Sequence, residues 1–255
     1  MSYDAGPDRG GEGRRGALLI AGVRRTARRF REDWRALPDA ARRRFLWTLA
    51  IGLGVSAGVM LGLCFVTRGL EEEGRLAWEG VLLRRLDRSD AMSFSTALWA
   101  ESPGNSVFMI PVVLAAALVC VWLRRPLRAL AVLAAFFMLD LVVLLGWLAW
   151  SRARPVAVAG GIASPGFHSF PSGHVAQIVA AYGFFVYLWL RASRSFWEQT
   201  LAVALFLGVL GSVALARLRL GSHWPSDILA GAAVGALWLA VVTAALRRAE
   251  DAGGR

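Results

Sequence analysis

The segment Gly166–His174 reads G-F-H-S-F-P-S-G-H and lies between two long apolar runs of the 255-residue chain. Its last four residues, Pro171–His174, stand where the downstream run begins. An apolar run of that length predicts a helix, so these four residues would form its N-terminus. A helix start offers unpaired backbone N–H groups and the positive end of the helix dipole, which attract anions. The segment therefore predicts an anion site.

Two further polar segments carry arginines on either side of this one. Ser151–Pro155 reads S-R-A-R-P, and Ala216–Asp227 reads A-R-L-R-L-G-S-H-W-P-S-D. Arginines can fork two donors onto phosphate oxygens, and imidazoles can attack phosphorus or carry protons near neutral pH. The three segments together predict a site that binds and attacks phosphate. The candidate residues are Arg152, Arg154, Ser172, Gly173, His174, Arg217, Arg219, His223 and Asp227.

Composition predicts a polytopic membrane protein. The chain is 56% hydrophobic, has a positive mean hydropathy, and repeats apolar runs long enough to cross a bilayer. Backbone polar groups cannot stay unpaired in lipid, and the runs are too continuous for an outer-membrane barrel, so each run is a helix. We expect an all-α bundle of six transmembrane helices, at Phe45–Val66, Val107–Leu123, Ala129–Trp150, His174–Leu190, Thr200–Ala216 and Asp227–Leu246.

The distribution of arginine predicts the orientation of this bundle. With a cytoplasmic N-terminus, the inner segments carry twenty arginines and the outer segments nine. Four of those nine belong to the candidate site, and the five within residues 67–106 are outnumbered by seven acids. The positive-inside rule therefore predicts cytoplasmic N- and C-termini. We expect a plasma (inner) membrane protein whose three motif segments face the periplasm or exterior.

The chain divides into an arm, residues 1–44, a transmembrane domain, residues 45–248, and a tail, residues 249–255. The arm has twelve arginines against six acids, and the Gly and Pro of its first sixteen residues predict disorder. Arg24–Arg44 could form a basic helix on anionic lipid headgroups. The alternative, a nucleic-acid arm, is disfavoured because the arm runs directly into a membrane span.

The remaining segments predict neither a cofactor nor a metal. Cys64 and Cys120 fall inside apolar runs and give no disulfide framework or metal-ligand spacing. Leu76–Leu86 has a partly amphipathic pattern, which fits either a helix along the outer interface or a solvated connector. Asp140 lies inside the third span, where we expect a hydrogen bond to a neighbouring helix. The oligomeric state is not indicated.

His223 and Asp227 have the spacing of a histidine oriented by a carboxylate. Pro225 prevents a regular helix between them, and Ser226 is a good N-cap for the sixth span. The carboxylate could thus bond back to the His223 ring and fix its tautomer, as in a catalytic triad.

The three segments resemble the three-part motif of the type 2 phosphatidic acid phosphatase (PAP2) superfamily. That pattern is Lys, six residues and Arg-Pro; then Pro-Ser-Gly-His; then Ser-Arg, five residues, His, three residues and Asp. The resemblance extends over roughly residues 45–248. The matching residues at the family spacings are Arg154, Pro155, Pro171, Ser172, Gly173, His174, Arg217, His223 and Asp227.

The resemblance implies a metal-independent phosphoric monoester or diphosphate hydrolase. His223 would be the nucleophile that forms a phosphohistidine, Asp227 would orient it, and His174 would protonate the leaving oxygen. The phosphoryl oxygens would be held by Arg154, Arg217, Ser172 and the Gly173 N–H.

Two positions depart from the family pattern. Trp147 stands where the family has Lys, and Ala216 stands where it has Ser. We hypothesise that Arg152 or Arg219 replaces the missing lysine charge. The substrate implied is a membrane lipid phosphate, namely undecaprenyl diphosphate, phosphatidic acid or phosphatidylglycerol phosphate, and the four arginines favour a polyprenyl diphosphate. A lipid phosphotransferase with the same intermediate stays open, as does a non-catalytic lipid-phosphate-binding protein with a decayed site.

Overall fold

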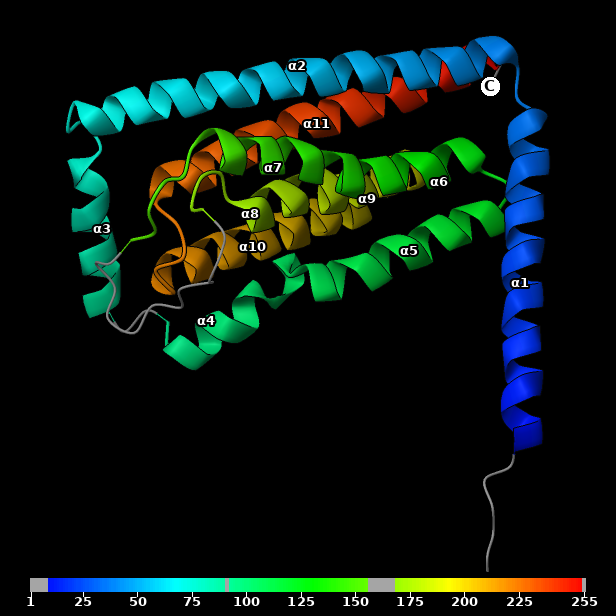
Figure 1. Cartoon of the computed structure of the whole chain (residues 1–255), viewed down its shortest axis with the longest axis horizontal. Helices are drawn as coiled ribbons and strands as arrows, with labels where there is room; N and C mark the ends of the chain where they lie inside the picture. Colours follow the sequence, from blue (N-terminus) through cyan, green and yellow to red (C-terminus); the bar gives the residue numbers. More distant parts are fainter. Residues whose placement is uncertain (1–8, 90–91, 156–167, 254–255) are drawn as a thin grey trace, which may run out of the picture.

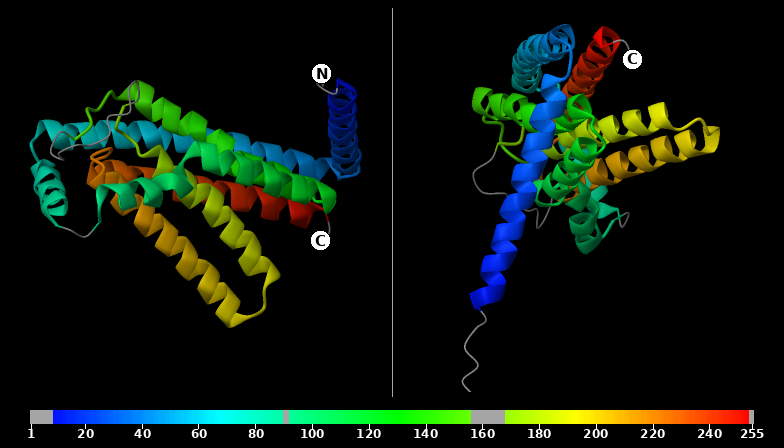
Figure 2. Two further views of the ribbon diagram at one scale, coloured as in Figure 1. Left: turned by 90° about the horizontal axis from the view of Figure 1, so that it is seen from below. Right: turned by 90° about the vertical axis from the view of Figure 1, so that its right-hand side faces the viewer.

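The computed structural model describes residues 9–89, 92–155 and 168–253. Throughout these ranges the chain is helical or irregular and forms no strand, so the all-α prediction is confirmed. Most of the long helices run side by side along one axis, and α1 lies across one end of the bundle (Figure 1), whereas the helices Gly183–Ala192 and Phe196–Arg219 angle away from the others (Figure 2). The elements are α1 (Arg9–Arg35), α2 (Asp39–Glu72), α3 (Ala77–Arg88), α4 (Phe94–Glu101), η1 (Ser102–Gly104), α5 (Ser106–Trp122), α6 (Pro126–Leu133), η2 (Ala134–Met138), α7 (Leu139–Ala149), α8 (Gly173–Gln177), η3 (Ile178–Tyr182), α9 (Gly183–Ala192), α10 (Phe196–Arg219) and α11 (Pro225–Ala252).

Six helical segments within the described residues are long and apolar enough to cross a membrane, as predicted. Each extends beyond the predicted apolar run, because backbone hydrogen bonding continues into polar residues that form helices well, such as Arg and Glu. The second span differs most, since α4 and η1 continue into α5. The segments are Asp39–Glu72, Phe94–Trp122, Pro126–Ala149, Gly173–Ala192, Phe196–Arg219 and Pro225–Ala252.

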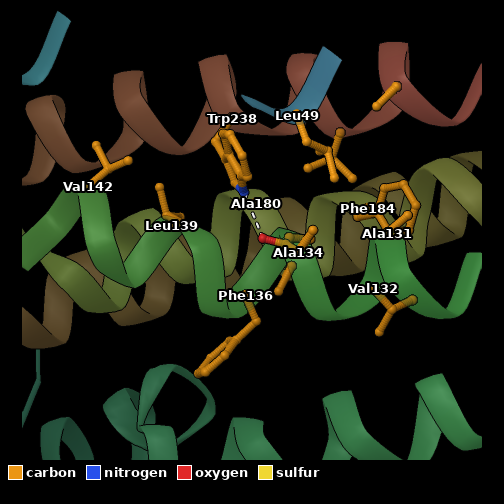
Figure 3. Packing of buried hydrophobic residues seen from close by; sticks show 14 of the residues in the cluster. Leu49, Ala131, Val132, Ala134, Phe136, Leu139, Val142, Ala180, Phe184 and Trp238 are labelled. Carbon is orange, nitrogen blue, oxygen red and sulfur yellow. Dashed lines mark hydrogen bonds between the residues drawn. The ribbon is translucent and has the colours of Figure 1, made fainter. Parts of the chain in front are cut away.

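The centre of the bundle is built around Trp238 of α11. Its side chain is fully buried, and its indole N–H donates to the carbonyl of Ala134 at 2.9 Å (Figure 3). Ala134 begins the π-helical turn η2, where a widened turn frees a carbonyl from its usual helical partner. Leu49 of α2 and Phe184 of α9 are buried in the same cluster. One indole thus joins the last span to the third inside an apolar core.

Helix α1 corrects two expectations about the N-terminal arm. It begins at Arg9, so part of the stretch predicted to be disordered is helical, whereas residues 1–8 lie outside the described residues. It ends at Arg35, ahead of Pro38, because a proline disfavours helical geometry in the residue before it. The predicted basic helix Arg24–Arg44 is therefore two helices. Figures 1 and 2 show α1 nearly perpendicular to α2, at the end of the bundle where the C-terminus also lies.

Helix α3 confirms that the amphipathic stretch Leu76–Leu86 is helical, and it is not a plain solvated connector. Glu79 and Leu83 on its inner face are buried. The helix closes the opposite end of the bundle from α1 (Figure 1).

Candidate active site

The three motif segments converge at the end of the bundle opposite the chain termini (Figure 1). Ser151–Pro155 follows α7, Ser169–Ser172 precedes α8, and Arg217–Asp227 joins the end of α10 to the start of α11. Because successive spans cross the bundle in opposite directions, every second connection lies at the same end. Segments far apart in the sequence therefore meet here.

Backbone contacts fix the three segments to one another. Ser169 N–H donates to the Arg152 carbonyl, and Ser172 N–H donates to the Asp227 carbonyl, each at 3.0 Å. Gly231 lets α11 come close to this junction, because a Cβ there would lie 2.5 Å from the carbonyl oxygen of Ser172. Only glycine fits such an approach, so α11 sets the position of the Pro-Ser-Gly-His segment.

A cavity of about 430 Å³ opens where the segments meet. Its volume is within the usual range for small-molecule sites. The structure brings five predicted site residues to its wall, and Trp147 and Asp140 line it as well. The five are Arg154, Gly173, His174, Arg217 and His223.

The imidazole of His223 is oriented by a backbone carbonyl. Its Nδ1 lies 2.7 Å from the carbonyl oxygen of Ser169 and 3.5 Å from Oδ2 of Asp227. A carbonyl oxygen can only accept, so Nδ1 carries the hydrogen and Nε2 carries the lone pair. Nε2 lies 3.4 Å from Nη2 of Arg217, on the cavity side. With this tautomer Nη2 of Arg217 donates to Nε2, so the nitrogen with the lone pair lies beside an arginine on the cavity wall.

Burial lowers the pKa of His223 below its ordinary value of 6.5. The hydrogen bond and charge of Asp227 raise this pKa, whereas the positive charges of Arg217 and Arg154 lower it further. The net shift is downward, so the ring is neutral at neutral pH. A neutral imidazole is the form that can act as a nucleophile.

Asp227 is fully buried and accepts hydrogen bonds from three other groups. Oδ2 accepts from the Ser169 hydroxyl in a short contact and from the Trp224 N–H at 2.8 Å, and Oδ1 accepts from Nη1 of Arg152 at 2.6 Å. Asp227 thus lies beside the His223 ring as expected, and the Ser169 carbonyl is a second and closer partner of Nδ1. Helix α11 starts at Pro225 with Trp224 as its N-cap, so Ser226 is not the cap.

Arg152 lies outside the cavity wall, behind Asp227. Besides Asp227, it donates through Nε to Glu71 at 3.0 Å and through Nη2 to Glu79 at 2.8 Å. Burial lowers its pKa, but the charges and hydrogen bonds of Asp227 and Glu79 outweigh that effect and the pKa is raised. The guanidinium is 2% exposed. Its donors are therefore committed to protein carboxylates.

The indole rings of Trp150 and Trp224 complete the enclosure of Arg152. The guanidinium carbon lies 5.2 Å from the first ring centroid and 5.3 Å from the second. Desolvated cation–π contacts of this kind stabilise a buried arginine. The prediction that Arg152 binds substrate, and the hypothesis that it replaces the family lysine, are both corrected by this arrangement.

Arg219 is also held away from the cavity. Its Nη1 donates to Asp87 of α3 at 3.0 Å, and its Nε donates to the Met92 carbonyl at 3.0 Å. It is two residues, or about half a helical turn, past Arg217 and so lies on another face of α10. The predicted phosphate contact is corrected: Arg219 joins α10 to the α3–α4 connection.

Arg217 and Arg154 are the arginines that line the cavity. Arg217 donates to Glu101 of α4 in a short contact, and Arg154 donates through Nη1 to the Ser222 carbonyl at 3.1 Å. Burial lowers the pKa of Arg154, and the charge of Arg217 lowers it further. Glu101 was not identified from the sequence, although it brings a carboxylate to the arginine that lies nearest the His223 lone pair.

Trp147 occupies the place of the family lysine with an aromatic ring. Its Nε1 donates to the Pro171 carbonyl at 3.1 Å, and a Cβ at Gly173 would lie 3.3 Å from the ring. Trp147 therefore packs against the backbone that begins α8. Ser172 is fully buried outside the cavity wall, and its hydroxyl finds no hydrogen-bond partner among the described residues. The Ser172 side chain is therefore not among the groups that line the cavity.

Asp140 makes the interhelical hydrogen bond that was expected of it. Its Oδ1 accepts from Nε2 of Gln177 in a short contact, and the same nitrogen lies 3.2 Å from the Phe136 carbonyl. This contact joins the third span to the fourth on the cavity wall. Among the residues that the structure describes, no group of three or more His, Cys, Asp or Glu side chains is arranged to hold a metal ion.

Comparisons with known proteins agree with the motif pattern. Residues 128–251 match the model of the PAP2 superfamily. A relative from Rhizobium johnstonii, named lipid A 1-phosphatase, is 38% identical over 78 residues, which cover 31% of this chain and 28% of the relative. A lipid A 1-phosphatase from Rhizobium etli is 37% identical over 78 residues, which cover 31% and 29%. The matched segment thus spans less than a third of these curated relatives.

The fold is similar to a solved membrane protein. The crystal structure of a transmembrane PAP2 type phosphatidylglycerolphosphate phosphatase from Bacillus subtilis superposes with a TM-score of 0.61. The superposition covers 81% of this chain and 95% of that one, at 17% sequence identity. The family resemblance predicted from the three motif segments is confirmed.

Proposed function

We propose that this chain, which matches the model of the PAP2 superfamily over residues 128–251, is a lipid phosphatase acting through a phosphohistidine at His223. One observation carries the proposal. The Nδ1–H of His223 points at the Ser169 carbonyl, which leaves the Nε2 lone pair on the wall of a cavity that also holds Arg217, Arg154 and His174. A nucleophile, two cations and a second imidazole in one cavity are the groups that phosphoryl transfer requires.

In the first half-reaction, Nε2 of His223 attacks phosphorus as the bond from phosphorus to the lipid oxygen breaks. His174 donates a proton to that oxygen, which leaves as a lipid hydroxyl. The ring acquires positive charge, and the buried carboxylate of Asp227 stabilises it. The Nδ1–H keeps its bond to the Ser169 carbonyl throughout.

In the second half-reaction, a water molecule attacks the phosphoryl group on His223. His174, now neutral, accepts a proton from that water, the nitrogen–phosphorus bond breaks, and inorganic phosphate leaves. Arg154, Arg217 and the N–H of Gly173 stabilise the phosphoryl oxygens in both steps. The reaction proposed here uses no metal ion.

The substrate that we propose is a lipid carrying a phosphate monoester. The earlier preference for a polyprenyl diphosphate depended on four arginines, and two of these, Arg152 and Arg219, bond to protein carboxylates instead. The remaining pair, Arg154 and Arg217, suits one phosphate. The names of the two Rhizobium relatives favour a lipid A-type 1-phosphate over phosphatidic acid.

We propose that the cavity faces the periplasm or exterior. The support is the arginine distribution, which is densest at the end of the bundle that carries the chain termini. A site at the opposite end of the spans can receive a headgroup while the acyl chains stay in the outer leaflet.

Phosphate release by the purified protein in detergent tests the function. The substrates are lipid A 1-phosphate, phosphatidic acid and undecaprenyl diphosphate, each at equal concentration. We expect fastest release from lipid A, and a loss of roughly 10⁴-fold or more for His223→Gln. His168→Gln is the matched control, because His168 is exposed beside Ser151 and lies outside the cavity wall.

Four outcomes separate the alternatives. Equal rates for the wild type and His223→Gln would exclude the proposed nucleophile. Binding of lipid phosphate with no release by either protein would support the non-catalytic alternative, which Trp147 in the lysine position favours. Transfer of the phosphoryl group to an added lipid or sugar acceptor, with acid-labile label on His223, would identify a phosphotransferase. Loss of release on adding a chelator would contradict the metal-independent step.

A further inference from the structure

A second cavity lies at the opposite end of the bundle from His223, where α1 meets α5 and α6. Its volume is about 770 Å³, larger than that of the catalytic cavity. Val23, Ala27 and Phe30 line it from α1, Leu118 lines it from α5, and Leu130 lines it from α6. We refer to this cavity as the α1 cleft. Its lining is almost entirely apolar, so it suits a hydrocarbon ligand.

The dimensions of the α1 cleft match one leaflet of a bilayer. Along α5 its lining runs from Leu114 to Trp122, a stretch of nine residues that spans about 12 Å of helix. One leaflet contributes roughly 15 Å of hydrocarbon, half of the bilayer core. Helix α1 lies nearly perpendicular to the spans (Figure 2), as expected of a helix in the plane of the membrane surface. The cleft is therefore the corner between a surface helix and two membrane-crossing helices.

The rim of the α1 cleft carries positive charge. Between Ile20 and Arg35 the chain has six arginines against two acids. The guanidinium of Arg29 lies 5.6 Å from the ring of Trp122, which lines the cleft. The Nε of Arg29 is buried, and no acceptor for it is found within the described part of the chain. Arg29 as a whole is half-buried, so the rest of its side chain stays open at the rim, where its positive charge suits an anionic ligand.

We propose that the α1 cleft binds one anionic phospholipid, with an acyl chain between α1 and α5 and its phosphodiester on Arg29. The apolar lining selects a lipid chain, and the arginine-rich rim selects a negative headgroup over a zwitterionic one. This site is separate from the catalytic cavity, and a phosphodiester lipid offers no monoester for hydrolysis. Its test is therefore independent of the proposed phosphatase activity.

The first test compares two lipids with the same chains. Purified full-length protein in detergent is mixed with dioleoyl-phosphatidylglycerol or dioleoyl-phosphatidylcholine, and bound lipid is counted by native mass spectrometry. We expect one phosphatidylglycerol to be retained at least about fivefold better than phosphatidylcholine. Equal retention of the two lipids would overturn the charge selection.

Gly22→Leu tests whether the chain occupies the cleft. Gly22 lines the cleft, and a Cβ there would meet nothing within 4 Å, so leucine fills space without a clash. The matched control is Gly58→Leu on α2, where a Cβ also meets nothing within 4 Å. We expect lipid retention to fall about tenfold in the first variant only. Equal retention in both variants would show that the cleft is not the binding site.

Arg29→Gln tests the headgroup contact. Its matched control is Arg24→Gln, which removes the same charge from an exposed position on α1. We expect retention of phosphatidylglycerol to fall about fivefold in Arg29→Gln and to stay near the wild-type level in Arg24→Gln. Equal losses would assign the binding to the general charge of α1 and overturn the role of Arg29. Phosphatidylcholine retention should be unchanged in both variants.

Discussion

Arg217 and Arg152 stand on opposite sides of the His223–Asp227 pair and differ in how many partners they have. Arg217 faces the cavity and shares one carboxylate, that of Glu101. Arg152 lies behind the pair and binds three carboxylates, including that of Asp227. A guanidinium with spare donors can exchange its partner for a ligand, whereas one saturated by buried acids cannot.

The same difference extends to the surroundings of each arginine. The buried side is closed by Trp150, Trp224 and Glu79, so its geometry is fixed before any substrate binds. The cavity side keeps an opening beside Nε2 of His223. We therefore expect substitutions on the buried side of the His223–Asp227 pair to change mainly stability. Substitutions on the cavity side should change mainly activity.

Arg152→Ala should produce the largest effect of the set. It leaves the buried carboxylates of Glu79 and Asp227 without a cation, which we expect to lower the free energy of unfolding by about 3–5 kcal/mol. Thermal unfolding in detergent measures this. Arg68→Ala is the control, because its pair with Glu72 is exposed and should contribute less than about 1 kcal/mol. A stable Arg152→Ala protein that has lost only substrate binding would contradict the comparison.

Arg217→Gln should act on chemistry and leave the fold in place. We expect phosphate release to fall by about 10²–10³-fold, the usual effect of removing one donor to a developing negative charge. The melting temperature should fall much less than in Arg152→Ala, since only one carboxylate, the 15% exposed Glu101, loses its partner. Arg219→Gln, on the same helix but outside the cavity wall, is the control and should keep most of its activity.

Ser169→Ala should have an intermediate effect, because Ser169 contacts both members of the pair. The substitution removes the hydroxyl that donates to Asp227 and keeps the carbonyl that orients His223. We expect kcat to fall roughly tenfold, as for one hydrogen bond to a charged group. Steady-state kinetics measure the effect, with Ser151→Ala as the control. An effect on KM alone would show that the Ser169 hydroxyl does not support His223 and Asp227 in the reaction.

The pH dependence should show the smallest change. Burial and the two cavity arginines lower the pKa of His223, so the neutral nucleophile persists below pH 6.5 and the acid limb of kcat/KM lies below that value. Because the unfolded chain binds this proton more readily, His223 also makes the folded state less stable as pH falls through that range. Arg217→Gln should move the acid limb of kcat/KM to higher pH, because it removes a positive charge that lowers the pKa of His223. An acid limb at the same pH would show that Arg217 does not cause the shift.

The sequence predicted the spans and the meeting of the motifs because both depend on local patterns. Continuous apolar runs identify membrane helices, and the number of crossings places Arg154, His174 and His223 at one end. The partner of Asp140 could also be anticipated, since a carboxylate inside a span needs one.

Local patterns could not predict which arginines line the cavity and which bind protein carboxylates. Arg152 binds Glu79, 73 residues earlier, and Arg219 binds Asp87, 132 residues earlier, so their partners depend on where α3 packs. Ser169 and Glu101 carry no local signal either. One contributes mainly a backbone carbonyl, and the other lies in a helix that the apolar pattern did not include.

The contact between Glu101 and Arg217 means that one of the two arginines on the cavity wall already holds a carboxylate in the resting protein. An arriving phosphate either shares Arg217 with that carboxylate or displaces it, so it gains less from the positive charge than it would from an arginine without a carboxylate partner. A monoanion such as chloride brings no advantage over Glu101, whereas a phosphate dianion does. The contact between Glu101 and Arg217 should therefore disfavour the binding of small monoanions in the absence of substrate.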